Sequence, residues 1–363
     1  MKILIVVTKS ELGGAQVFAL NLARGLKARG EDVTIAGGPG EYLPEALAKS
    51  DIPFYRFQNL ERSYNPLKVF KFIKELKDYV KNNGFEVVHL NSTNALFGVW
   101  GLAGLKPSPK IVFTVHGLSF LDPNHRTNFI ISFAYQFLFK TAWKKITRLV
   151  FVSRLNYASV LKRGLAKTGE LIYNGLDLRS EYFEGREEAR KYLGTQVGSD
   201  LSNAYIVGSI GRLAYPKNYE FLINSFTEIK KLKPNAKIIL IGEGPERAKY
   251  ETLIKSYRYE KEVYLLGEIQ EAGRYLRAFD LFVLPSVFEG MSLSLMEALA
   301  AGVPAIASRV GGSEEIIGIE NCFALNNKAE FLEKLVSVKL KKVEDNLFTQ
   351  EKMVEGYRNL YLS

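Results

Sequence analysis

The densest set of chemical groups in the sequence lies between Ser286 and Ala298, which reads SVFEGMSLSLMEA. This string predicts a loop that leads into a helix, with Glu289 on the loop and Glu297 within the helix. Carboxylate oxygens accept hydrogen bonds from vicinal hydroxyl groups, and the first amides of a helix add donors beside them. The string therefore indicates a site for a sugar or a ribose. A surface helix with incidental acids would explain Glu297 alone, but not the whole string.

Two cations precede this string, at the end of a strand that glycine marks. Arg212 and Lys217 lie five residues apart in the segment Gly208–Asn218, GSIGRLAYPKN. A guanidinium binds two phosphate oxygens at once and a lysine adds a movable point charge, so the pair suits a diphosphate. The alternative is a solvated surface pair. The next strand ends in Gly242-Glu243-Gly244, whose glycines are expected to leave room for a flat base.

A histidine stands at a strand end in the first half of the chain. The strand 110–115 leads into His116-Gly117 and places the imidazole at the carboxyl edge of a sheet, where open α/β sheets bind ligands. A lone histidine is more often structural, but this position favours a functional role. His89, near the end of another strand, is a weaker candidate for the same role.

Paired glycines follow two further strands. Gly13-Gly14 opens a helix, where backbone amides approach an anion, although a tight turn is the alternative. The fingerprint G-x-G-x-x-G is absent, which argues against a nicotinamide or flavin site. Gly311-Gly312 is expected to offer free amides to the same site as Glu289.

Short β-branched runs alternate with longer amphipathic segments throughout, which predicts repeated βα units and parallel sheets. The expected strands are 2–8, 32–36, 54–57, 86–90, 110–115, 149–152, 170–172, 205–210, 237–241, 263–266, 281–284 and 304–308. The chain is therefore expected to fold as α/β with two Rossmann-like doubly wound domains, 1–175 and 176–348. The segment 178–203 has the weakest pattern, and residues 349–363 read as a separate amphipathic helix.

Composition agrees with a soluble two-domain protein. The chain has 363 residues, of which 24% are charged, and its single cysteine excludes an internal disulfide framework. Residues 1–175 hold 24 Lys and Arg against 12 Asp and Glu, and the whole chain has a net charge of +10. A basic half of this kind indicates contact with a phosphate-rich surface, although a generally basic proteome is an equal alternative.

Taken together, these motifs resemble the family-4 retaining glycosyltransferases with the GT-B fold, and the resemblance covers nearly the whole chain. The matching pieces are Gly13-Gly14-Ala15, Thr114–Gly117, Val152-Ser153, Tyr173–Asp177, Gly211-Arg212-Leu213 with Lys217, Gly242–Pro245, and Phe288-Glu289-Gly290 through Glu297-Ala298. The resemblance implies two domains that face each other across a cleft, with a last helix that crosses back to the first domain. It also implies an acceptor in the first domain, a nucleotide sugar in the second, and transfer with retention at the anomeric carbon.

The resemblance further implies roles for individual residues. Arg212 and Lys217 would bind the diphosphate, Glu297 the ribose, and Glu289 the donor sugar, while His116 would lie near the reacting carbon. The acceptor side would comprise Gly13, Gly14 and His116, and the catalytic set His116, Glu289, Arg212 and Lys217. The donor side would comprise Gly14, Gly211, Arg212, Lys217, Gly242, Gly244, Glu289, Gly290, Met291, Ser292, Leu293 and Glu297.

The chain departs from the family in two places, and both concern the site. Met291-Ser292 stands where Phe-Gly or Leu-Pro is common after Glu-Gly, and Asn91 stands where many members have a second histidine. The first departure leaves the details of sugar recognition undefined, and the specificity for the acceptor cannot be carried over from the family. Uridine diphosphate sugars are favoured over guanosine diphosphate sugars, and no metal or other cofactor is expected because Arg212, Lys217 and helix amides would stabilise the leaving diphosphate.

The expected function is transfer of a hexose or N-acetylhexosamine to a glycan or lipid-linked acceptor in cell-surface polysaccharide or glycolipid synthesis. Two alternatives stay open: a GT-B nucleotide-sugar epimerase, and a non-catalytic basic protein that binds membranes or nucleic acid. No nucleic-acid motif is visible, so nucleic acid is not an expected partner. The expected location is the cytoplasm, with peripheral contact at the inner face of an anionic membrane through residues 128–140 as an option; simple packing of that segment inside the first domain is the other.

Overall fold

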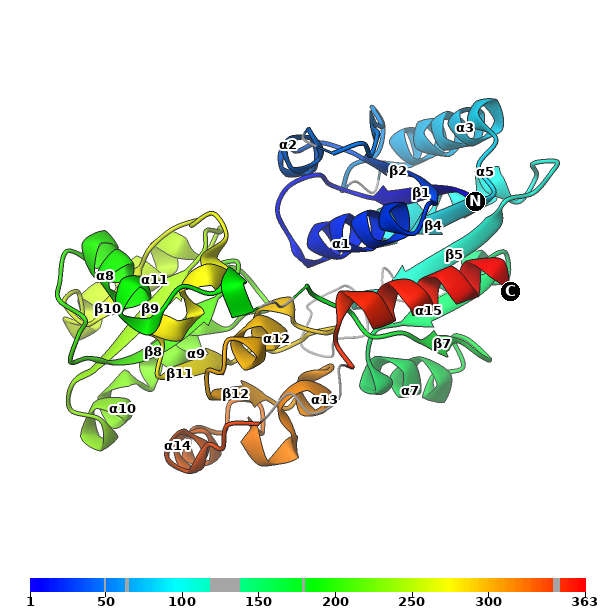
Figure 1. The fold of residues 1–363 in the computed structure, drawn as a ribbon. Helices are drawn as coiled ribbons and strands as arrows, with labels where there is room; N and C mark the ends of the chain where they lie inside the picture. The colour runs from blue at the N-terminus through cyan, green and yellow to red at the C-terminus, as the bar shows by residue number, and fades with distance from the viewer. Residues whose placement is uncertain (49, 63–64, 118–137, 178–179, 342–346) are drawn as a thin grey trace. The chain divides into compact units, whose positions relative to one another are not determined.

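The computed structural model describes residues 1–48, 50–62, 65–117, 138–177, 180–341 and 347–363 (Figure 1). The chain divides into two compact units. The first unit comprises Met1–Asp177 and Leu347–Ser363, and the second comprises Leu178–Asn346. Each unit is built on its own parallel sheet, so the prediction of two Rossmann-like domains is confirmed.

The sheet of the first unit has the order β3-β2-β1-β4-β5-β6-β7, with all neighbours parallel. Alternate residues of β1 enter opposite cores, because Ile3 and Ile5 pack with the helix α1 (Gly14–Ala28) whereas Leu4 and Val6 pack with the helix α3 (Pro66–Asn83). Burial on both faces explains the continuous apolar run at the start of the chain. The strands are β1 (Lys2–Val7), β2 (Asp32–Gly37), β3 (Phe54–Arg56), β4 (Val87–Leu90), β5 (Lys110–Val115), β6 (Arg148–Phe151) and β7 (Glu170–Leu171).

The helices of the first unit have clear local signals at their ends. In α3, Asn65 Oδ1 accepts a hydrogen bond from Leu67 N, Pro66 occupies the first turn, and Gly84 ends the helix in the left-handed conformation. Further helices of the first unit are α2 (Tyr42–Leu47), α4 (Thr93–Leu96), α5 (Val99–Leu102), α7 (Arg154–Lys162) and α15 (Gln350–Leu362), and residues 138–143 are also helical.

The last helix, α15, packs beside α1 in the first unit (Figure 1). Gly25 makes this approach possible, because a Cβ at this position would lie 2.3 Å from Val354 Cγ2. Lys110 Nζ donates to the carbonyl oxygen of Tyr361 at 2.6 Å, and Arg358 pairs with the buried Glu31 at 2.8 Å. The expectation that the C-terminal helix returns to the first domain is thus confirmed.

The sheet of the second unit has the order β10-β9-β8-β11-β12-β13, again with all neighbours parallel. Its strands are β8 (Tyr205–Ile210), β9 (Ala236–Ile241), β10 (Val263–Leu265), β11 (Leu281–Leu284), β12 (Ala305–Ser308) and β13 (Cys322–Phe323). Its helices are α8 (Arg186–Val197), α9 (Tyr219–Asn224), α10 (Phe226–Leu232), α11 (Arg247–Tyr257), α12 (Leu293–Ala300), α13 (Ser313–Ile317) and α14 (Lys328–Ser337), with 3₁₀ turns η2 (Ser180–Tyr182), η3 (Ala272–Ala278) and η4 (Ile319–Asn321).

All twelve predicted strands are present, with boundaries that differ by at most one residue. Two elements were not predicted. The strand β13 has only two residues, too few to show a period. The helix α8 falls in the polar segment 178–203, where only Ala189, Arg190 and Leu193 of the helix are buried.

Candidate functional site

The strand order of the second sheet places a switch point beside β8. The chain leaves β8 for β9 on one side and later adds β11 on the other, and ligands of open α/β sheets bind outside the carboxyl ends at such a point. Arg212 follows β8, and Glu289 follows β11. The segment with Arg212 and the segment with Glu289 therefore begin at the ends of neighbouring strands.

The residues Lys217, Ser286 and Glu289 form one hydrogen-bonded cluster at this edge. Lys217 Nζ donates to Glu289 Oε1 at 2.7 Å, and Ser286 Oγ donates to the same oxygen at 2.6 Å. Burial opposes the charged form of Lys217, but the Glu289 carboxylate outweighs that cost and raises the pKa of the lysine. Lys217 is therefore held as a cation, and a diphosphate that used it would have to compete with Glu289 or share it.

Arg212 stands apart from this cluster. Its side chain is exposed, and no hydrogen-bond or ion-pair partner for it exists among the described residues. Its guanidinium therefore keeps its full set of donors for an anion.

Glu297 lies on α12, the helix that the loop with Glu289 enters. Ser292 caps this helix, since its Oγ accepts from Leu295 N at 3.4 Å. Burial raises the pKa of Glu297 to about 7, and no partner for its carboxylate occurs in the described part of the chain. The backbone of η3 passes close to the Glu297 carboxylate, because a Cβ at Gly273 would lie 3.3 Å from Glu297 Oε2. An unpaired, partly buried carboxylate of this kind is suited to accept hydrogen bonds from ligand hydroxyls.

The positions where Gly242 and Gly244 would carry side chains face a neighbouring loop, and their part in holding a flat base stays a prediction. Gly242 has φ +141°, and a Cβ there would lie 2.2 Å from Gly211 O; a Cβ at Gly244 would lie 2.3 Å from Leu213 O. The space that the absent side chains leave is filled by the loop after β8. These glycines therefore let two loops pack backbone against backbone, and that packing fixes the segment that carries Arg212.

Replacing Gly242 by alanine should accordingly destabilise the second unit by roughly 1–3 kcal/mol or more, because it adds a left-handed strain and a backbone clash. Urea unfolding of the full chain measures this loss. The matched control is Gly302→Ala, since Gly302 also has a positive φ of 74° but no atom within 4 Å of its Cβ position. Equal losses for the two variants would show that the clash is relieved without cost.

The segment after Glu289 is also tightly packed. Gly312 N donates to Gly290 O at 2.7 Å, so the expectation that both amides of Gly311-Gly312 are free is wrong. A Cβ at Gly311 would lie 2.3 Å from Glu289 O, which places this loop directly against the acidic one. Met291 and Ser292 are buried, and Leu293 is half-buried.

The first sheet has a corresponding switch point between β1 and β4. Thr8 and Ser92, which follow these strands, are joined by a hydrogen bond from Thr8 N to Ser92 Oγ at 2.8 Å. Gly13 is the N-cap of α1, and Gly14 begins the helix, is exposed, and has no atom within 4 Å of its Cβ position. The first amides of α1 thus begin at this edge, as the paired glycines predicted.

His116 follows β5 at the same edge, and its ring is held on two sides. Its Nε2 lies 3.2 Å from Asn91 Oδ1, and its ring packs edge-on against Phe18 of α1 with centroids 4.5 Å apart. Burial lowers the pKa of His116 to about 3, so the imidazole is neutral at physiological pH.

His89 lies within β4 and is fully buried, so its weaker candidacy for a role at the sheet edge is not supported by its position. Its Nε2 lies 2.7 Å from Thr114 Oγ1, and its Nδ1 lies 2.6 Å from the hydroxyl of Tyr361 on α15. It is a polar link between the sheet and the last helix.

The residues that sequence reasoning did not assign to the site are Asn91 and Ser286. Asn91 directly follows β4, and Ser286 follows β11 after Pro285, so the rule that selected His116 would also have selected them. Their partners could not be read from the sequence, because Ser286 reaches a residue across a loop and Asn91 reaches a different strand end.

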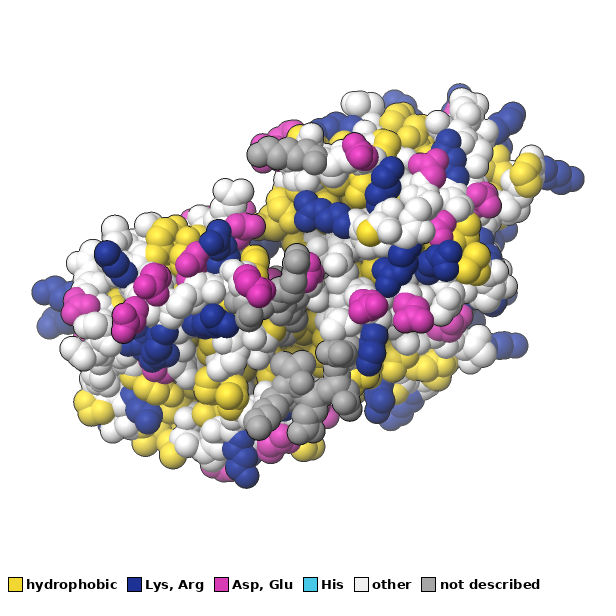
Figure 2. Space-filling view, in the orientation of Figure 1, with side chains coloured by type: hydrophobic (Ala, Val, Ile, Leu, Met, Phe, Trp, Pro, Cys, Tyr) yellow, Lys and Arg dark blue, Asp and Glu magenta, His cyan; other side chains and the backbone are white. Residues whose placement is uncertain are grey.

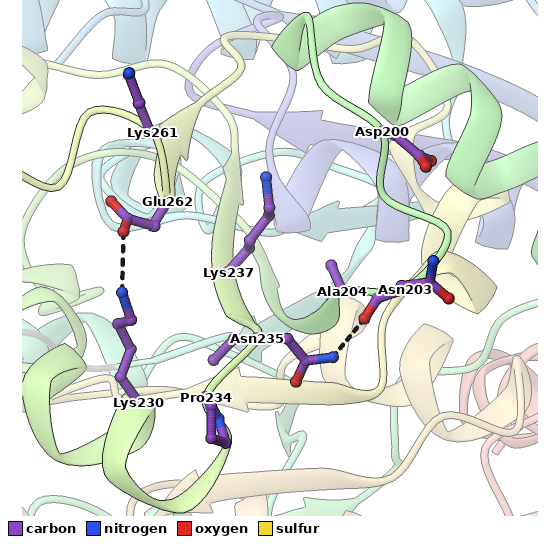
Figure 3. A pocket seen from close by; sticks show the side chains of 10 residues that line it. Asp200, Asn203, Ala204, Lys230, Pro234, Asn235, Lys237, Lys261 and Glu262 are labelled. Carbon is purple, nitrogen blue, oxygen red and sulfur yellow. Dashed lines mark hydrogen bonds and ion pairs between the residues drawn. The ribbon is translucent and has the colours of Figure 1, made fainter.

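A cavity of about 370 Å³ lies at the opposite, amino edge of the second sheet (Figure 3). Lys230 and Glu262 form an ion pair across it at 3.0 Å. Its lining comprises Asp200, Asn203, Ala204, Lys230, Pro234, Asn235, Ala236, Lys237, Lys261 and Glu262. None of the predicted site residues lines this cavity, and we do not assign the donor to it.

Two further expectations concern metals and membranes. Within the described ranges, no three histidine, cysteine or acidic side chains are grouped as metal ligands would be. No described helix is both long and apolar enough to cross a bilayer. Of the segment 128–140, residues 128–137 lie outside the described residues.

Comparisons with known proteins agree with this geometry. Residues 12–180 match the model described as Glycosyltransferase Family 4, and residues 198–352 match that described as Glycosyl transferases group 1. An Escherichia coli protein named UDP-Gal:alpha-D-GlcNAc-diphosphoundecaprenol alpha-1,3-galactosyltransferase is 26% identical over 89% of this chain and 85% of its own.

Solved structures extend the likeness to the fold. A sucrose-phosphate synthase from Thermosynechococcus elongatus matches all of this chain and 98% of its own with a TM-score of 0.80 and 20% identity. The Anabaena protein HepE in complex with UDP-glucose matches 99% of each chain with a TM-score of 0.77 and 18% identity. The motifs, the switch-point geometry and these matches all point to one family.

Proposed function

Because the chain belongs to the family-4 glycosyltransferases and has their two-domain GT-B fold, we propose that it transfers a hexose or N-acetylhexosamine, with retention, from a UDP sugar to a glycan or lipid-linked acceptor. The product would serve cell-surface polysaccharide or glycolipid synthesis. The second unit would bind the donor, and the first the acceptor. The observation that carries the proposal is the set of Arg212, Lys217, Glu289 and Glu297 around the switch point of the second sheet.

The charges of this set suit the reaction. When the bond between the anomeric carbon and the diphosphate oxygen breaks, negative charge grows on the diphosphate and positive charge on the sugar ring. Arg212 and Lys217 would stabilise the first, and the Glu289 carboxylate would hold hydroxyl groups of the sugar. With two cations available to the leaving group, no divalent ion is needed, so we expect activity in EDTA.

Retention follows if the acceptor hydroxyl enters on the face that the diphosphate leaves. The acceptor oxygen then bonds to the anomeric carbon while its proton passes to a departing phosphate oxygen. No protein base is required, and a neutral His116 is consistent with an orienting role.

The donor and its metal requirement are tested by one screen. Thermal unfolding of the full chain with UDP, GDP and their sugars in EDTA should show stabilisation by UDP compounds, about 2.7 kcal/mol at 100 times Kd. UDP is the nucleotide named for both the E. coli relative and the HepE complex. Stabilisation by GDP sugars alone would show that the donor carries GDP instead of UDP. No stabilisation by any of these compounds would refute the assignment of a nucleotide-sugar donor.

A lipid-linked acceptor would place the enzyme at the inner face of a membrane, and α3 offers a surface for this contact. Its outer face carries Leu67 and Phe70, which are 71% and 69% exposed, while Phe72, Leu76 and Val80 are buried on its inner face. The exposed lysines of α3 are Lys68, Lys71, Lys74, Lys77 and Lys81. The helix also carries Glu75 and the exposed Asp78. On the face that Figure 2 shows, basic and acidic side chains are interspersed.

Replacing Lys71 and Lys74 by alanine should weaken binding to anionic vesicles by about 30-fold, since each basic residue near such a surface contributes about 1 kcal/mol. Flotation with phosphatidylglycerol vesicles measures the change, and Lys231→Ala on α10 with Lys255→Ala on α11 is the matched control. Binding of the wild-type chain that is equal for anionic and neutral vesicles would end the membrane part of the proposal.

A further inference from the structure

Asn91 is a buried amide at the first switch point, and both ends of its side chain are engaged. It is 1% exposed, and it follows β4 directly. Its Nδ2 donates to the carbonyl oxygen of His89 at 3.1 Å, and its Oδ1 faces His116 Nε2 at 3.2 Å. Its backbone nitrogen donates to Val6 O at 2.9 Å, so the residue is tied to β1 as well.

These contacts determine which nitrogen of His116 carries the proton. A carbonyl oxygen only accepts, so the atom of Asn91 that faces His89 O must be the amide nitrogen. The amide oxygen then faces His116, and an oxygen without a hydrogen can bind Nε2 only if Nε2 carries a proton. A neutral imidazole has one proton, which leaves a lone pair on Nδ1.

The groups around the Asn91 amide are held in place, which supports this orientation of the amide. The His89 carbonyl is fixed in β4, and the His89 ring is anchored by Thr114 and by Tyr361 of α15. Phe18 closes the other side of the His116 ring. Among the described residues nothing hydrogen-bonds to His116 Nδ1, and the ring is partly exposed.

We propose that Asn91 is a positioning residue that holds His116 as the Nε2–H tautomer, so that His116 Nδ1 accepts a hydrogen bond from a hydroxyl group of the bound sugar. The inference rests on the proposed function. It means that His116 Nδ1 accepts a hydrogen bond and that His116 does not protonate a leaving group. A hydroxyl group at the matching position of the sugar would be bound, and a deoxy or methoxy group there would be rejected.

The tautomer can be observed without any activity. The chain has three histidines, so ¹⁵N-histidine labelling of the full chain with His89→Gln and His125→Gln variants assigns the ring signals of His116. Long-range ¹H–¹⁵N spectra at pH 7 should show a protonated Nε2 and an unprotonated Nδ1 in the wild type. In Asn91→Leu the two tautomers should mix. A wild-type His116 that is protonated on Nδ1, or an unchanged tautomer in Asn91→Leu, would overturn the proposal.

Kinetics test the consequence. Asn91→Leu should lower kcat/KM for the UDP sugar by about 3- to 10-fold, the size of one neutral hydrogen bond, with little change in UDP affinity because UDP lacks the sugar. The control is Asn83→Leu, which removes a similar amide contact at the end of α3. Equal kcat/KM in Asn91→Leu and wild type would refute the positioning role even if the tautomer is as inferred.

Asn91→Asp distinguishes positioning from simple packing. Its size is unchanged, but a carboxylate against Nε2 would favour the imidazolium, which carries a proton on Nδ1 as well. Both Asn91→Asp and Asn91→Leu lose the hydrogen bond to the His89 carbonyl, so the two variants differ in the charge beside Nε2. The Phe18 ring packs against the His116 ring, and the titratable group that interacts with His116 electrostatically is His89. Activity of Asn91→Asp should therefore be low at pH 6 and recover with rising pH, whereas that of Asn91→Leu should not. An activity of Asn91→Asp that does not change with pH would contradict the proposal. If no UDP sugar is a substrate, the proposed function is refuted, while the spectra still decide which tautomer His116 adopts.

Discussion

Arg212→Ala should lower kcat/KM for the donor by about 10- to 150-fold, because a hydrogen bond to a charged group contributes roughly 1.5–3 kcal/mol. The loss is expected in the transition state, where negative charge on the leaving diphosphate is greatest. Steady-state kinetics with the UDP sugar identified by thermal unfolding measure it. Arg212→Lys should recover part of the loss, since it keeps the charge but not the two-pronged geometry.

This variant is easy to interpret because Arg212 has no partner in the described structure, so its removal leaves nothing unpaired. Stability should change by less than about 0.5 kcal/mol. Lys255→Ala on α11 is a control for loss of one positive charge from the same unit. If Arg212→Ala stays within about twofold of the wild type, Arg212 does not bind the diphosphate.

Glu297→Gln should have two opposite effects, a gain in stability at high pH and a loss of donor binding. The pKa of Glu297 is raised by burial from its ordinary 4.5 to about 7, so the folded chain holds the protonated form more tightly than the unfolded chain. The protonated Glu297 therefore contributes its full share to the free energy of unfolding below pH 4.5, and this contribution is lost as the pH rises through 7. The difference amounts to roughly 3 kcal/mol, and glutamine should avoid that cost at pH 8 but change little at pH 4.5.

The same substitution should weaken UDP binding by about 10- to 150-fold at pH 8, since a neutral amide replaces a carboxylate against the ribose hydroxyls. Urea unfolding at the two pH values and calorimetric titration with UDP measure the two effects. UDP affinity of the wild type should also fall between pH 8 and pH 6, whereas that of Glu297→Gln should not follow this titration. Unchanged UDP affinity in the variant would remove Glu297 from the donor site.

The sequence was sufficient for the fold because its signals are local. Strands buried on both faces read as apolar runs, and the glycine and proline positions at helix ends set the boundaries. The positions of Arg212, Glu289 and His116 at strand ends followed from the same rule. Contacts between loops could not be predicted from the sequence: nothing in it shows that the loop after β8 packs against the backbone of glycines 242 and 244.

Hydrogen-bond partners were equally hidden. The sequence marked Lys217 and Glu289 separately, one for phosphate and one for sugar, yet they bind each other at 2.7 Å. Asn91 was noted only as a departure from a family pattern, and its engagement with His116 depends on the register of β4 beside β5. Such pairings join residues 25 to 72 positions apart, and no periodicity reports them.

Because α15 packs on the first unit, the first unit is synthesised first but can finish folding only after the second unit has been synthesised. Residues 178–346 leave the ribosome before the helix that packs against α1, so the second unit can fold while the first still lacks the contact of Val354 with Gly25. His89 gains the Tyr361 hydroxyl, and Thr114 the Tyr357 hydroxyl, only when the last turns emerge. A ribosome-stalled chain that stops before α15 should therefore have a folded second unit and an unfinished first one.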